Sequence, residues 1–117
     1  MRLAQFVLIH FESRGHLVPI AVMLLESGTD RLRLQYRRDW ESIADPSDAE
    51  VLRHHFSQLD MEATQRPGEE LLARLESILS NAIRITERRA VRFEGPVDDL
   101  VARLFIDHVE KCKGDLK

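Results

Sequence analysis

Histidine is the residue type that most invites a metal or catalytic interpretation, because five histidines occur in 117 residues. His10 and His16 flank the carboxylate of Glu12. Alternation along two paired strands directs His10 and His16 to opposite faces, so they are not expected to share one ion. His54 and His55 are neighbours roughly 100° apart on a predicted helix. They lack the four-residue spacing of a zinc pair, so no metal site is predicted.

Nucleophilic and acid–base chemistry lack a recognisable motif as well. None of the serines lies in a nucleophile motif such as G-x-S-x-G. Cys112 is the single cysteine, and the five glycines are scattered and form no phosphate-binding loop. The carboxylate pairs at 69–70 and 98–99 suit the positive ends of helices. We therefore predict no catalytic residue and no cofactor, and an enzyme is the least favoured function.

Arginine is the second residue type that could carry a function, by contacting the phosphates of a nucleic acid. Residues 1–38 hold six arginines against three acids, and residues 84–93 hold four arginines and one glutamate. Residues 39–83 hold ten acidic and three basic side chains, so ion pairing between layers of one fold is the competing interpretation.

Nucleic-acid binding is therefore kept as the alternative function. It needs the strand predicted at 31–36 to lie beside the strand predicted near 83–93, so that their arginines form one patch. The net charge of −3 and the lack of interleaved aromatic residues argue against it. The candidate residues are Arg31, Arg33, Arg37, Arg38, Arg84, Arg88, Arg89 and Arg92.

The elements that must position these residues begin with a hairpin. Residues 3–11 (LAQFVLIHF) and 16–25 (HLVPIAVMLL) are apolar runs of strand length, rich in β-branched and aromatic side chains. Turn-forming residues at 12–15, with Gly15 free to adopt positive φ, predict that the two strands are antiparallel neighbours.

The register of this hairpin decides which side chains share a face. We expect Phe11 to pair with His16, so that Ile9 pairs with Val18. Pro19 lacks an amide donor and should direct its nitrogen away from a partner strand. One face is then expected to gather Phe11, Ile9, Val7, Leu3, Val18, Ile20, Val22 and Leu24.

The opposite face of the hairpin is unusually apolar for a surface in water. Leaving such side chains exposed costs ~1.5–3 kcal/mol each, so either a helix of this chain or another protein chain must cover them. The leading hypothesis is a non-catalytic interaction module that pairs with itself or with another protein. Its expected interaction residues are Phe6, Leu8, Pro19, Ala21 and Met23.

The rest of the chain predicts one edge strand, three helices and a returning strand. Residues 31–36 (RLRLQY) alternate as a half-buried strand at a sheet edge, with Leu32, Leu34 and Tyr36 inward. Helices are predicted from about 46 to 64, from 69 to 81 and from 96 onward. Residues 83–93 fit one broken strand or two short ones, and His108 is interpreted as a core residue of the last helix.

These elements predict a single α+β domain over residues 1–117, with a mainly antiparallel sheet of order βββααβα and helices packed on it. No apolar run reaches the ~20 residues of a membrane span, and no signal peptide is recognised. A lone cysteine gives no disulfide framework, so we expect a cytoplasmic protein.

Two stretches give the chain a resemblance to a known family. Residues 15–24 (GHLVPIAVML), and residues 98–105 (DDLVARLF) followed by Val109, are similar to domain-of-unknown-function family 3037, a group of small bacterial proteins. This chain has Pro19 and Ala21 where family members usually have Asn and Gly. The family has no established activity. Its members are often encoded beside proteins that resemble HipA-like kinases, so the resemblance implies a protein partner.

Overall fold

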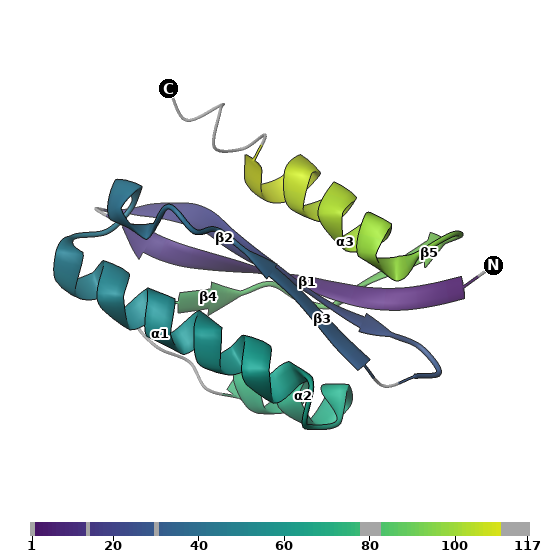
Figure 1. The fold of residues 1–117 in the computed structure, drawn as a ribbon. Helices are drawn as coiled ribbons and strands as arrows, with labels where there is room; N and C mark the ends of the chain where they lie inside the picture. Colours follow the sequence, from purple (N-terminus) through teal and green to yellow (C-terminus); the bar gives the residue numbers. More distant parts are fainter. Residues whose placement is uncertain (1, 14, 30, 78–82, 111–117) are drawn as a thin grey trace.

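The structure is a computed structural model that describes residues 2–13, 15–29, 31–77 and 83–110, and it has an α+β fold (Figure 1). The strands are β1 (Arg2–Ser13), β2 (His16–Glu26), β3 (Arg31–Tyr36), β4 (Ile83–Ile85) and β5 (Arg89–Phe93). The α-helices are α1 (Pro46–Ala63), α2 (Gly68–Ser77) and α3 (Val97–Phe105). A short 3-10 turn, η1 (Trp40–Ser42), precedes α1, and a π-helical turn, η2 (Ile106–Glu110), follows α3. Within the described ranges, none of the helices is both long and apolar enough to cross a membrane.

The five strands form one antiparallel sheet in the order β3-β2-β1-β4, and β5 also pairs with β1. The returning segment is therefore two short strands that follow one edge of β1, with β4 opposite 9–11 and β5 opposite 2–6. Thr86 bridges the gap between them, since its N–H donates to the Leu8 carbonyl at 3.0 Å and its hydroxyl accepts from the Leu8 N–H at 2.9 Å. Among the described strands, β3 ends the sheet on the other side, which confirms the predicted edge position.

The register of the β1–β2 hairpin differs from the expected one. Ser13, not Phe11, pairs with His16, and Gly15 in the turn adopts a φ of 83°. Farther along, His10 pairs with Pro19 but Ile9 pairs with Ala21, so the register shifts by one residue. This shift is a β-bulge, in which two residues of one strand oppose one residue of its partner. A bulge tolerates Pro19, because its missing amide donor is not needed there.

The bulge changes which side chains of β2 share a face with β1. Val7, Ile9 and Phe11 lie together as expected, but Ala21 and Met23 join them in one buried cluster. Val22 and Leu24, expected on that face, instead join Phe6 and Leu8 in a second cluster. Leu3, also expected inside, is half-exposed. The extra residue lies in β2 and moves the later side chains of that strand, Val22 and Leu24 among them, to the other face, so the expected set was wrong for β2 beyond the bulge.

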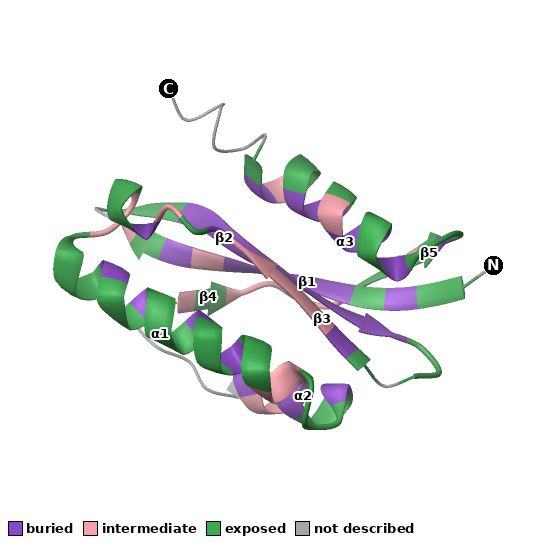
Figure 2. Cartoon of the chain, in the orientation of Figure 1, coloured by how far each residue is buried: buried purple, intermediate pink, exposed green. Residues whose placement is uncertain are grey.

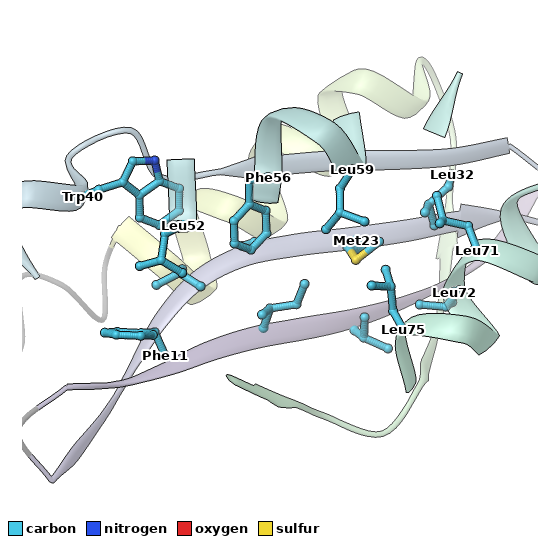
Figure 3. Close-up of a cluster of buried hydrophobic side chains, with 14 of the residues drawn as sticks. Phe11, Met23, Leu32, Trp40, Leu52, Phe56, Leu59, Leu71, Leu72 and Leu75 are labelled. Carbon is cyan, nitrogen blue, oxygen red and sulfur yellow. The ribbon is translucent and has the colours of Figure 1, made fainter. Parts of the chain in front are cut away.

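Helices of this chain cover both faces of the sheet, with α1 and α2 on one side and α3 on the other (Figures 1 and 2). Asp45 is the N-cap of α1, because its side chain accepts a hydrogen bond from the Asp48 N–H at 2.8 Å. Pro46 occupies the first turn of the helix. Trp40 closes the core, stacked on Phe56 at 5.4 Å between ring centroids. Figure 3 shows these rings with leucines of α1 and α2 over the sheet.

The remaining helix predictions have mixed outcomes. α2 begins one residue before the predicted start, and the predicted end of this helix at 81 lies outside the described residues. The helix predicted from 96 onward is α3, which buries an apolar stripe through Leu100, Val101, Leu104 and Phe105. His108 is half-buried, and its ring lies 5.8 Å from that of Phe6 between centroids. Cys112 lies beyond the described part of the chain.

Phe56→Ala is expected to lower the free energy of unfolding by about 3–5 kcal/mol, because the Phe56 side chain is 1% exposed and its removal leaves a cavity. Val51→Ala is the matched control on the same helix, since Val51 is 65% exposed. It should change the free energy of unfolding by less than about 0.5 kcal/mol. Urea denaturation followed by circular dichroism measures both values, and equal losses would contradict this packing of α1.

Candidate functional site

The five residues expected to form an apolar interaction face are all buried in the structure. Phe6 and Leu8 lie in the cluster beneath α3, whereas Ala21 and Met23 lie in the cluster beneath α1 and α2. Pro19 is buried at the bulge. The five side chains therefore do not form one surface, because the bulge divides them and helices of the same chain cover each group.

The eight candidate arginines do not form one patch either. Four lie on or directly after β3, and four lie on or between β4 and β5. The sheet order sets β2 and β1 between these two groups, so the adjacency on which the single patch depends is absent. Two arginines of the second group form ion pairs, Arg84 with Glu12 at 3.8 Å and Arg88 with Glu69 at 2.7 Å. The hydrogen bond from Arg88 lowers the pKa of Glu69.

Histidine side chains line two hollows in the surface. An apolar cavity of about 250 Å³ between α1, α2 and β4 has His55 at its wall, and burial lowers the pKa of this histidine. A groove of about 620 Å³ along α1 contains His54, Ser57 and Glu62. Arg74 binds the Glu62 carboxylate and lowers its pKa, and His54 and Ser57 show no hydrogen bond to each other.

Neither hollow assembles a nucleophile, its base and a group that orients the base, which catalysis of this kind requires. His10 is partly buried on β1, and desolvation lowers its pKa. In the described segments, no group of three or more metal-ligating side chains is arranged to hold an ion.

The outer edge of β3 is the site that the fold leaves open. Among the strands that the structure describes, only β2 pairs with β3. Immediately after β3, the Arg37 N–H donates to the Ile20 carbonyl at 2.9 Å. Hydrogen-bonded pairs alternate along antiparallel strands, so Gln35 and Arg33 also bond to β2. The backbone groups of Leu32, Leu34 and Tyr36 therefore point away from the sheet.

The two sides of this edge differ in chemistry. Leu32 is buried, and Leu34 and Tyr36 are partly exposed on the side of α1 and α2. Tyr36 stacks on Phe56 with 5.3 Å between ring centroids. β3 runs between these helices and α3 (Figure 1), and it contacts all three of them. The strand thus offers a row of backbone groups with an apolar border on one side.

Basic side chains border the same edge on the side of α3. Arg31 is exposed and forms no ion pair with the described residues. Arg33 bonds Asp98 of α3 at 3.2 Å through Nη1, while its buried Nε has no hydrogen-bond partner in the described structure. Arg38, directly after β3, instead lies beside Tyr36, with its guanidinium 5.2 Å from the centre of the ring.

Arg37 differs from the other arginines near β3 because its side chain is only 4% exposed. Its Nε and Nη2 donate to the two carboxylate oxygens of Asp39 at 2.8 and 2.7 Å. This paired geometry is the strong form of an arginine–carboxylate contact. Arg37 therefore holds the end of β3 in place and is not offered to a ligand.

No protein-family model, curated protein or solved structure matches this chain, so the resemblance to family 3037 stays a prediction. The sequence did predict β3 as an edge strand, from the alternation in RLRLQY. It did not predict that the backbone of Leu32, Leu34 and Tyr36 would face outward, because the alternation of side chains shows only that these residues point toward the core.

Proline substitutions test which backbone groups of β3 face outward. Gln35→Pro removes an N–H that bonds to β2 and leaves a carbonyl of β2 unpaired, whereas Leu34→Pro removes an N–H that points away. Each proline variant is compared with the alanine variant at the same position, so that the effect of losing the side chain is subtracted. On this basis, Gln35→Pro should lower the free energy of unfolding by about 1–3 kcal/mol more than Leu34→Pro. Chemical denaturation gives the four values; the reverse order would show that the alternation is assigned wrongly.

Removal of Asp39 tests the buried arginine. Asp39→Ala leaves the Arg37 guanidinium buried and without its main partner, and we expect a loss of about 3 kcal/mol in the free energy of unfolding. That is the low end of the usual range, because the Asp39 side chain is about a third exposed. Arg37→Met removes the charge itself and should cost less. Thermal and urea denaturation of both variants measure the difference, and a costlier Arg37→Met would contradict this account.

Proposed function

We propose that this chain is a non-catalytic protein-interaction module that binds an extended segment of another protein by adding it to the sheet beside β3. The observation that carries the proposal is the outward row of backbone groups at Leu32, Leu34 and Tyr36, on a strand that pairs with β2 alone among the described strands. Such an edge is a template for another strand, because its N–H and C=O groups lack partners.

The surroundings of β3 support strand addition over a flat contact. In this mode the main chain supplies affinity, and alternate side chains of the ligand enter pockets on the two sides of the sheet. β3 has six residues, which at ~3.3 Å each is an edge of roughly 20 Å. Leu34 and Tyr36 remain partly exposed beside it and would contact apolar side chains of an added strand.

The competing functions have less support. The apolar sheet face expected to bind a partner lies inside the protein. The interaction is therefore proposed at the edge of β3 and not at that face. The apolar cavity of about 250 Å³ is below the ~300 Å³ at which ligand pockets usually begin. The larger groove along α1 is lined mainly by polar side chains, and Arg74 already binds Glu62 there. The resemblance to family 3037, which implies a protein partner, agrees with the proposed class.

Selection of random peptides on the purified chain tests the proposal. Peptides that bind the unmodified chain should no longer bind Leu34→Pro, which lacks an outward N–H. They should still bind Leu34→Ala, but more weakly, because this variant keeps the N–H and loses only an apolar contact. Amide exchange measured by NMR should slow at Leu32, Leu34 and Tyr36 when peptide is added. The amides of Arg33 and Gln35, already bonded to β2, serve as internal controls.

Two results would overturn strand addition at β3. One is a selection that yields no binding peptide. The other is a set of peptides that bind Leu34→Pro and Leu34→Ala equally well and slow amide exchange only at other sites.

A further inference from the structure

We infer that the segment added to β3 alternates acidic and apolar residues and belongs to a different protein, not to a second copy of this chain. This inference rests on the strand addition proposed above. It concerns which side chains the added strand carries, and it follows from the chemistry that borders the two sides of the edge.

Residues directly opposite each other in neighbouring antiparallel strands point to the same face of the sheet. A residue opposite Arg31 or Arg33 therefore lies on the α3 side, next to a guanidinium. Carboxylates suit these positions. The exposed Arg31 has no ion pair with a described residue, and Arg33 uses only its Nη1 to bond Asp98. Arg33 Nε has no acceptor there either. Arginine binds carboxylates through paired donors.

Residues opposite Leu32, Leu34 and Tyr36 lie on the other side, toward α1 and α2. Leu34 and Tyr36 are partly exposed there, so apolar side chains of the added strand would be shielded from water. Since alternate residues of a strand face opposite sides, the complementary sequence places an acid at every second position and an apolar residue between them.

A second copy of the chain fits this edge poorly. Pairing two copies of β3 about a two-fold axis keeps equivalent faces together, so the arginines of one copy oppose side chains of the same row in the other. An axis at Arg33 sets Arg33 against itself, and an axis at Leu32 sets Arg31 against Arg33. Like charges directly opposite each other destabilise a strand pair.

Nucleic acid is also disfavoured as the occupant. Half of the candidate arginines lie on the far edge of the sheet, and Asp98 stands beside Arg33 within hydrogen-bond distance. The chain carries a net charge of −3. Phosphate contacts would also leave the outward backbone row unused.

Three fluorescent peptides of equal length probe the inference. Each alternates valine with one other residue, which is glutamate, glutamine or lysine. In fluorescence anisotropy at low salt, the glutamate peptide should bind about tenfold more tightly than the glutamine peptide and still more tightly than the lysine peptide. Leu34→Pro should abolish binding of the glutamate peptide, whereas Leu34→Ala, which keeps the outward N–H and loses only the apolar contact, should weaken it without abolishing it.

Charge reversal on the protein locates the effect. Arg31→Glu should weaken binding of the glutamate peptide about tenfold and strengthen binding of the lysine peptide. Arg92→Glu is the matched control, an exposed arginine on β5 at the other edge of the sheet, and should change affinity less than about twofold. Arg33→Gln, which keeps polarity without charge, gives a second reading. Thermal midpoints establish that each variant is folded.

The possible outcomes separate the two proposals. Equal binding of the three peptides, lost only in Leu34→Pro, would overturn the acidic preference and leave strand addition intact. No binding by any of them, together with failure of the random-peptide selection, would overturn both. A dimer in light scattering that Leu34→Pro abolishes would identify a second copy as the occupant. Salt-sensitive binding of a single-stranded oligonucleotide that Arg31→Glu weakens, without peptide binding, would identify nucleic acid.

Discussion

The structure depends on one constraint, which is that the β1–β2 hairpin is apolar on both faces. Each face must be removed from water, since exposed apolar side chains of this size cost ~1.5–3 kcal/mol each. The chain meets this requirement with two separate buried clusters, one beneath α1 and α2 and one beneath α3. The central strands are thus enclosed on both faces, and the open features of the protein are moved to the strand edges.

The edges are treated differently. On one side β4 and β5 follow β1, and Arg84 and Arg88 there are held by carboxylates of the same chain. On the other side β3 carries its arginines beside an outward backbone row, and only Arg37 is fully engaged by a neighbouring carboxylate. Positive charge along an open edge discourages pairing with itself, which is a common protection of sheet proteins. The same charge leaves the edge accessible to an acidic strand.

Much of the fold could be predicted from the sequence, because alternation in 3–11 and 31–36 and the Asp45-Pro46 helix start are local signals. The β2 register could not be predicted, since a bulge adds one residue without changing the hydrophobic pattern. Pro19 was the only signal of the bulge in the sequence. The sequence also could not show which chain covers the second apolar face, because that depends on the docking of α3. The candidate site was visible as an edge strand, yet its open backbone depends on the sheet order.

The buried cluster beneath α3 is the last part of the core to be completed during synthesis. α3 follows every strand of the sheet in the chain, and Val109 in the turn after it is fully buried in the cluster with Phe6 and Leu8. During synthesis, the hairpin and its first two helices can assemble while this face has no cover. The nascent chain therefore passes through a stage in which one apolar face of the hairpin is exposed to solvent. At this stage the chain would most need a chaperone, because α3 does not yet cover that face.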